Sequence, residues 1–351
     1  MIFLDTIPLD RDFVQTVEGL YFCVVGYVHP PNRILAYLKY IPSDSGKWKS
    51  EDQPLQRMLP YYSAQAVINT FQFLKSNYPH YLFHDAFNNM TFSTVPFEFI
   101  KTYYPAKMKL EEILNLSNLD PLQSKLKSLV TTLSNASGVP IEAFGITGSI
   151  LLDIHNPEFS DMDVTIHGYE NAFRVKQKMK KLLSEGHPDI LPLNLNERER
   201  WQNDKSKRFG MTQEEAAVLF TRKWNMGEYQ NTRFSLHPIR NIDEINENYG
   251  DKTFIRKGDI EIQATITDDS EALFLPSKYK VNDIRILKWM KVKDIREVVS
   301  YEGLFDSVAE NNELIKVKGQ LESVIDNQHE GNYFRIVVGS QKAKKEYIAR
   351  I

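Results

Sequence analysis

Two neighbouring strands joined by a short connection constrain the fold of this chain most. We predict the strands at residues 141–146 and 161–167, with Thr147-Gly148-Ser149 directly after the first. Successive side chains of a strand point to opposite faces, so Asp161 and Asp163 are expected to project from the same face. An amphipathic helix is expected after the second strand. The segment therefore predicts an α/β element that presents two carboxylates side by side.

Two adjacent carboxylates indicate a bound cation. Asp161 and Asp163 would repel each other without one, and their oxygens suit Mg²⁺ that is held together with substrate phosphates. Gly148 would let the backbone approach a phosphate closely, and Ser149 adds a hydroxyl donor. If Ser149 opens a helix over 150–154, the first amides of that helix would also favour an anionic triphosphate. These residues predict a metal-assisted nucleotide site.

In these features the chain resembles the DNA polymerase β-like nucleotidyltransferase superfamily. The signature of that family is a Gly-Ser pair after a strand, about ten residues of helix and loop, and then Asp-x-Asp between apolar residues. Gly148-Ser149 and Asp161-Met162-Asp163 match it, and Ser160 stands where a serine often precedes the first aspartate. The resemblance covers roughly residues 120–270, and the outer parts are similar to predicted archaeal nucleotidyltransferases of unassigned substrate.

The family also has a third carboxylate on a later, neighbouring strand, framed by apolar residues. Ile260-Glu261-Ile262 matches that frame, which makes Glu261 the third expected catalytic residue and metal ligand. Asp259 would share its face and is a rival for the role. The family often has glycine four residues after the serine, where this chain has Asp153. Because Asp tolerates a left-handed backbone better than most residues, we expect the turn to survive.

The resemblance implies a metal-dependent transferase that moves an NMP from an NTP to a hydroxyl acceptor and releases pyrophosphate. Two Mg²⁺ (or Mn²⁺) ions would lie between the nucleotide and Asp161, Asp163 and Glu261. One ion would lower the pKa of the attacking hydroxyl, and the other would stabilise the departing pyrophosphate. The acceptor could be the end of an RNA or another nucleic acid, a small molecule or a protein.

Other functions remain open at this point. Glycosyltransferases also use Asp-x-Asp to hold a metal and a nucleotide-sugar diphosphate. A non-catalytic module could use the same fold to bind a nucleotide or a nucleic acid, because fold does not imply function.

Arg222 and Lys223 are the expected triphosphate-binding cations. Thr212-Gln213-Glu214-Glu215 has the spacing of a capping box, which predicts a helix that ends near Trp224. The two cations stand at its C-terminal end, where they could neutralise phosphate oxygens. Cations are equally expected there because of the helix dipole, so a structural role is the alternative.

The chain as a whole is predicted to be an α+β protein of several domains. Its 351 residues suffice for two or three domains. We predict an α/β domain at 1–115, a nucleotidyltransferase core with a mixed sheet and helices at 116–275, and a small β-rich domain at 276–351. The core would carry a long insertion at about 187–255. In the first domain, a hairpin of strands at 20–28 and 33–41 is expected to precede a loop at 48–60.

Composition excludes some classes of partner and cofactor. The formal net charge of -3 gives no global sign of a nucleic-acid partner, although a local basic groove remains possible. Cys23 is the single cysteine, which excludes an intramolecular disulfide and a cysteine-based zinc site. The N-terminus lacks the basic start of a signal peptide, and no stretch approaches the roughly 18 apolar residues of a membrane span. We therefore expect a cytoplasmic protein without membrane contact.

Overall fold

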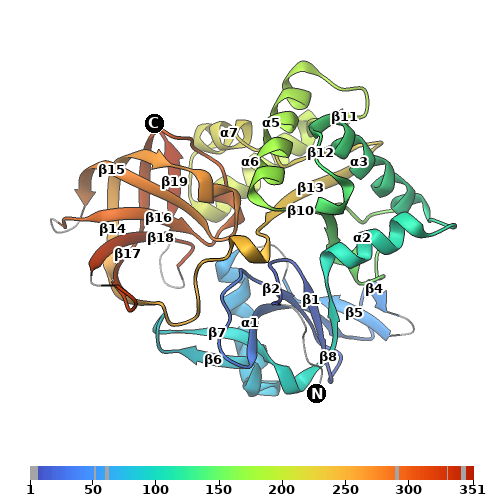
Figure 1. Ribbon diagram of the computed structural model, residues 1–351, viewed down its shortest axis with the longest axis horizontal. Coiled ribbons are helices and arrows are strands. Elements are labelled where there is room, and N and C mark those ends of the chain that lie inside the picture. The colour runs from blue at the N-terminus through green and yellow to red at the C-terminus, as the bar shows by residue number, and fades with distance from the viewer. Residues whose placement is uncertain (1–6, 51–52, 60–62, 289–291, 330, 341–344) are drawn as a thin grey trace. The chain divides into compact units, whose positions relative to one another are not determined.

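The protein is an α+β structure made of two compact units. The computed structural model describes residues 7–50, 53–59, 63–288, 292–329, 331–340 and 345–351. These residues form seven α-helices and three sheets (Figure 1). The first unit consists of Met1–Pro60, Ser93–Leu193 and Trp224–Asn246, and the second of Tyr61–Phe92, Asn194–Lys223 and Glu247–Ile351. Each unit thus combines several stretches of the chain, whereas the sequence predicted three consecutive segments.

The first sheet contains the predicted N-terminal hairpin. Its strand order is β4-β5-β3-β2-β1-β8, with β7 paired to β3 and β6 paired to β7. The antiparallel pairing of β2 with β3 confirms the hairpin. The loop expected at 48–60 is wrong, because β4 and β5 form there and Leu55 is fully buried. The bounds are β1 (Phe13–Thr16), β2 (Tyr21–Val24), β3 (Arg33–Pro42), β4 (Trp48–Ser50), β5 (Gln53–Arg57), β6 (Leu82–Asp85), β7 (Met90–Pro96) and β8 (Ile100–Tyr104).

The second sheet lies in the first unit and has the order β11-β12-β13-β10-β9. β10 pairs with β9 antiparallel and with β13 parallel. Its strands are β9 (Phe144–Thr147), β10 (Met162–His167), β11 (Ile190–Leu191), β12 (Met226–Tyr229) and β13 (Thr232–Ile239). The helices that accompany it are α2 (Ala106–Asn115), α3 (Pro121–Ser137), α4 (Gly148–Leu151) and α5 (Tyr169–Glu185), of which α3 and α5 contact β10 and each other.

Helix α3 begins and ends where its sequence predicts. The Asp120 carboxylate accepts hydrogen bonds from the amides of Leu122 and Gln123, and the Gln123 side chain completes a capping box. Pro121 occupies the first turn, where its missing N–H costs nothing. Gly138 ends the helix in a left-handed conformation with φ of 68°.

The third sheet forms a closed barrel in the second unit. β14 pairs with β15, β15 with β16, β16 with β18, β18 with β17, and β17 with β14 again. β19 pairs with the first part of β17, from Ile315 to Lys318. The strands are β14 (Lys252–Asp268), β15 (Ser277–Lys288), β16 (Ile295–Ser300), β17 (Leu314–Asp326), β18 (Asn332–Val338) and β19 (Tyr347–Arg350). The helices of this unit are α1 (Ala64–Asn77), α6 (Leu195–Phe209) and α7 (Gln213–Thr221).

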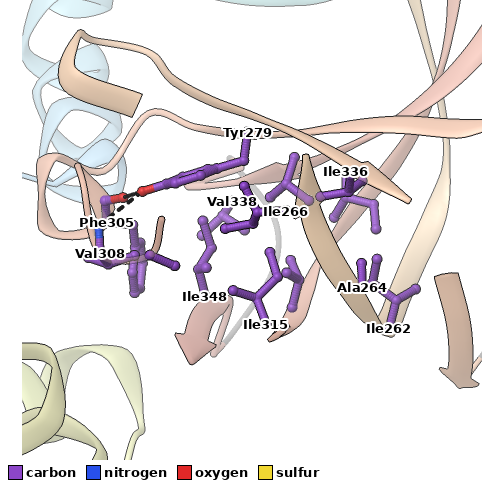
Figure 2. Packing of buried hydrophobic residues seen from close by; sticks show 14 of the residues in the cluster. Ile262, Ala264, Ile266, Tyr279, Phe305, Val308, Ile315, Ile336, Val338 and Ile348 are labelled. Atoms are coloured by element: carbon purple, nitrogen blue, oxygen red, sulfur yellow. Dashed lines mark hydrogen bonds between the residues drawn. The ribbon is translucent and has the colours of Figure 1, made fainter. Parts of the chain in front are cut away.

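Strand alternation builds the barrel core. Ile262, Ala264 and Ile266 point inward and are fully buried (Figure 2). The residues between them, Gln263 and Thr265, are half-buried and alternate to the other face of the strand. The Tyr279 hydroxyl lies inside this core, where it donates to the Phe305 carbonyl oxygen at 2.6 Å and accepts from the Val308 amide at 3.1 Å. These bonds satisfy a polar group that burial would otherwise penalise.

The predicted insertion belongs to both units. Its strands β12 and β13 complete the second sheet, while Ala216 and Leu219 of α7 join the core cluster of the barrel. The α7 capping box is present, with Thr212 and Glu215 bonded to each other's backbone amides. Among the described helices, none is both long and apolar enough to cross a membrane.

Glu302 is a buried carboxyl in the second unit. Its Oε1 accepts a hydrogen bond from the Ala64 amide at the start of α1, at 2.9 Å. Burial raises the pKa of Glu302 to about 7, helped by the nearby charge of Glu346 and opposed by the bond from Ala64. The folded protein therefore favours the protonated form of the Glu302 carboxyl.

This pKa predicts a pH-dependent stability. Because the pKa of Glu302 is higher in the folded than in the unfolded protein, its protonated form stabilises the fold. This stabilisation is fully present below the ordinary pKa of 4.5 and is lost as the pH rises through about 7. A pKa shift of this size corresponds to a loss of about 3 kcal/mol. We expect Glu302→Gln, which cannot ionise, to raise the melting temperature at pH near 8 and to leave it nearly unchanged at pH near 4.5. Equal shifts at both pH values in a thermal melt would contradict this assignment.

Candidate functional site

Asp161 and Asp163 stand at the beginning of β10. Met162 and Val164 are fully buried, whereas Asp163 is half-buried and Asp161, directly before the strand, is exposed. This alternation agrees with the predicted placement of both carboxylates on one side of the strand. The pair lies in the first unit, between β9 and β13.

Two side chains of β13 hold Asp163. Ser235 is directly opposite Asp163 in the parallel pairing, and its hydroxyl donates to Asp163 Oδ1 at 2.5 Å. The His237 Nε2 atom lies 2.8 Å from Ser235 Oγ and 3.7 Å from Asp163 Oδ1. A hydrogen-bonded row of three polar groups therefore crosses from β13 to β10.

The surroundings of Asp163 keep its carboxyl ionised. Burial alone would raise the pKa of Asp163. The hydrogen bond and charge of His237, the charge of Lys39 and the Ser235 hydroxyl outweigh burial and hold this pKa well below its usual range. Asp163 is thus a carboxylate that the protein stabilises before any ligand is bound.

Lys39 of β3 is a buried cation at this site. Only 4% of its surface is exposed, and its Nζ lies 4.9 Å from the centre of the Phe13 ring. Its charge reaches Asp163, as the pKa of that residue indicates. The N-terminal sheet therefore contributes positive charge near Asp163.

The Gly-Ser turn lies against Asp163. Thr147 is paired with Asp163 across β9 and β10, and Gly148 follows with φ of 73°. A Cβ atom on Gly148 would lie 2.6 Å from Asp163 Oδ2, so a larger residue would displace the carboxylate. The helix begins at Gly148 and not after Ser149, which is half-buried in its first turn.

The connection after the Gly-Ser turn keeps the expected backbone. Asp153 has φ of 53°, the left-handed conformation expected where the resembled family often has glycine. Its carboxylate pairs with Lys109 Nζ of α2 at 2.6 Å. The side chain thus fixes a turn that glycine would adopt without strain.

The expectation that Glu261 lies on a strand next to the aspartate pair is wrong. β10 pairs with β9 and β13 in the described sheet, while Glu261 lies on β14 of the barrel. Its carboxylate is held by Lys316 Nζ at 2.9 Å, Lys288 Nζ at 3.5 Å and the Tyr347 hydroxyl at 3.2 Å. Its rival Asp259 lies on the same strand of the barrel.

Arg222 and Lys223 contact acidic groups of the second unit. Arg222 Nη2 pairs with Glu313 Oε1 at 2.8 Å. Lys223 pairs with Asp306 and donates to the Gly303 carbonyl oxygen at 3.0 Å. Both cations therefore join the end of α7 to the barrel, which is the structural role left open by the sequence.

Comparison with known proteins places the chain in a family without assigning an activity. The uncharacterized protein MJ1086 of Methanocaldococcus jannaschii is 34% identical over 348 residues, which cover 96% of this chain and 97% of that protein. The chain belongs to the MJ1086 family. No family model matches it, and no solved structure matches it. The similarity to MJ1086 extends over both units of the chain.

Three site residues of this MJ1086-family chain are not among those predicted from the sequence. Lys39 stands in the otherwise apolar and aromatic stretch Ile34-Leu35-Ala36-Tyr37-Leu38-Lys39-Tyr40-Ile41, and a charge in such a strand is a signal for a buried partner. The position of His237 at the site depends on the pairing of β13 with β10, which is not visible in the sequence. Ser235 carries no signal of its own.

The donor set around Asp163 fits a phosphate-bound Mg²⁺ ion. Mg²⁺ is commonly held by one or two carboxylates plus substrate phosphates and waters, and Asp161 and Asp163 are two such carboxylates at the beginning of β10. Among the described residues, no group of three His, Cys, Asp or Glu side chains is arranged as a metal site.

Proposed function

We propose that the protein is a metal-dependent nucleotidyltransferase that moves an NMP from an NTP to a hydroxyl acceptor and releases pyrophosphate. The observation that carries the proposal is the position of Gly148 directly against the carboxylate of Asp163. A backbone turn and a carboxylate in contact offer amides for phosphate oxygens beside a ligand for their counter-ion. An isolated Asp-x-Asp on a solvated strand would lack this turn.

The order of the strands supports the same proposal. The strand before Gly148-Ser149, the strand of Asp163 and the later strand β13 are neighbours in the order β9-β10-β13. The resembled family has its Gly-Ser strand, its Asp-x-Asp strand and a later neighbouring strand in one sheet. A specific nucleotidyltransferase core is therefore the proposed finer assignment of this α+β unit.

Each residue of the site has a proposed task. Gly148 leaves room for the Asp163 carboxylate beside the turn, and Ser149 offers its hydroxyl to a phosphate oxygen. Asp161 and Asp163 would hold the ion, and a bound Mg²⁺ or Mn²⁺ would neutralise the triphosphate and stabilise pyrophosphate as it leaves. Lys39 adds positive charge behind Asp163. Ser235 and His237 are positioning residues that orient Asp163.

A non-catalytic nucleotide-binding role is the second candidate. It is favoured by β13, the later strand that neighbours the aspartate strand, because the residues that approach Asp163 from it are Ser235 and His237 and not a carboxylate. A site with two carboxylates could bind a metal-nucleotide complex without activating an acceptor. The two candidates differ in whether a covalent product forms.

Labelled nucleotides distinguish these candidates. The protein is incubated with Mg²⁺ or Mn²⁺, cellular RNA and each NTP, labelled in separate reactions at the α- or the γ-phosphate. We expect the α-label to enter a product and the γ-label to leave in pyrophosphate, because the bond between the α- and β-phosphates breaks. Transfer of the γ-label would contradict nucleotidyl transfer, and nucleotide binding without any transferred label would support the non-catalytic role.

A further inference from the structure

The barrel of the second unit has the strand order of an OB-fold. Numbered within the barrel, its five strands run 1-2-3-5-4 and close from strand 4 back to strand 1, as β14-β15-β16-β18-β17-β14. The pairing of strands 3 and 5, β16 with β18, is parallel, while the other pairs of the ring are antiparallel. Barrels of this kind commonly bind oligonucleotides or oligosaccharides with the face of strands 2 and 3 and the adjoining loops, and β15 is strand 2 of this barrel.

One outer face of this barrel is basic. Glu261 and Gln263 of β14 belong to this outer face, because their neighbours Ile262 and Ala264 point into the core (Figure 2). β14 is the central strand of the face, since it pairs with β15 on one side and with β17 on the other. The pairing places cations on both sides of this central strand. Glu261 lies between Lys288 of β15 and Lys318 of β17. Gln263 lies between Arg285 of β15 and Lys316 of β17. We call these four cations the basic face.

The basic face carries more positive than negative charge. The carboxylate of Glu261 is shared between Lys316 at 2.9 Å and Lys288 at 3.5 Å, and Asp259 lies two residues further along β14. Lys288 is 79% exposed, so most of its side chain is available to a partner. In a chain with a formal net charge of -3, such an excess on one sheet face is a local feature.

Other cations of the barrel have acidic partners of their own. Lys280 pairs with Asp268 at 2.9 Å, Lys278 with Glu247 at 3.0 Å, and Arg296 with Asp294 at 2.9 Å. The part of the surface that carries Lys278, Lys280 and Arg296 is therefore close to neutral. An aromatic ring also accompanies the basic face, because the Tyr347 ring of β19 lies 5.8 Å from Lys316 Nζ.

We propose that the basic face binds the backbone of a single-stranded nucleic acid. Closely spaced cations on neighbouring strands match the regular charges of a phosphate backbone, and a nearby aromatic ring offers a surface for a base. This function is separate from nucleotidyl transfer and requires neither NTP nor metal. It gives the second unit a task that the aspartate pair does not perform.

Binding of a fluorescently labelled single-stranded RNA of about 12 nucleotides tests this proposal. Anisotropy is measured without NTP or divalent metal, at several salt concentrations, for the full-length protein. Arg285→Gln with Lys288→Gln removes two exposed cations, so little effect on folding is expected. We expect the RNA affinity of this variant to fall at least about tenfold near 0.1 M salt. The slope of log affinity against log salt should become less steep by about 1.4, because each of the two lost contacts to a single strand contributes about 0.7.

Two further variants make the outcome decisive. Lys280→Gln with Arg296→Gln removes two exposed cations whose partners are Asp268 and Asp294, and it should bind RNA like the wild type. Glu261→Gln removes negative charge from the basic face and should strengthen binding. Wild-type affinity and salt slope in the Arg285 and Lys288 variant would overturn the proposal, as would an equal loss in the Lys280 and Arg296 variant. Thermal melts establish that each variant is folded.

Discussion

Asp163→Asn is expected to reduce nucleotidyl transfer by about a thousandfold, because it removes several kcal/mol of metal-assisted stabilisation of the transition state. Asp161→Asn should have a comparable effect, since both carboxylates would hold the same ion. Single-turnover transfer of α-labelled NTP measures both losses. Transfer at the wild-type rate in both variants would contradict the proposed mechanism.

The same two variants should differ in stability. From the sequence alone, relief of repulsion predicts that either substitution preserves or raises thermal stability. The structure changes this expectation for Asp163, whose carboxylate is stabilised by His237, Lys39 and Ser235. We expect Asp163→Asn to lower the melting temperature at neutral pH without metal, and Asp161→Asn, at an exposed position, to leave it unchanged or raise it. Identical melting temperatures for the two variants would show that the cations around Asp163 do not stabilise it.

Gly148→Ala is expected to abolish metal-dependent nucleotide binding in a folded protein. The added methyl group would meet Asp163 Oδ2 at 2.6 Å and push the carboxylate away from Ser235. The positive φ of 73° adds a backbone cost of about 1 kcal/mol. Isothermal titration with a non-hydrolysable NTP analogue and Mg²⁺ measures the loss.

Gly138→Ala is the matched control for that variant. Gly138 has a similar φ of 68°, and no atom lies within 4 Å of the position of an added Cβ. The control should show the backbone cost in a thermal melt but keep nucleotide affinity. If both variants bind nucleotide like the wild type, the Gly-Ser turn has only a structural role.

Local signals in the sequence predicted local structure well. Asp120-Pro121 and Gly138 mark the ends of α3, and Thr212 with Glu215 marks the start of α7, because caps depend on neighbouring backbone amides. The strand carrying Asp163 and the left-handed Asp153 were also predictable from short segments.

Long-range pairing was not predictable in the same way. The apolar frame of Glu261 is a strand signal, and it does not specify which sheet the strand joins. β13 lies within the segment interpreted as an insertion, yet it completes the sheet beside Asp163. Lys39 reaches the site from a strand more than a hundred residues earlier, which no local pattern reveals.

The nucleotide affinity of the wild type, Asp161→Asn and Asp163→Asn, each with and without Mg²⁺, tests the central claim most directly. The claim is that the two aspartates hold the ion that binds the triphosphate beside Gly148. Titration calorimetry with a non-hydrolysable NTP analogue should show at least about tenfold tighter binding with Mg²⁺ for the wild type, and little dependence on Mg²⁺ for either variant. An equal gain from Mg²⁺ in all three proteins would contradict the claim and place the metal-nucleotide site elsewhere.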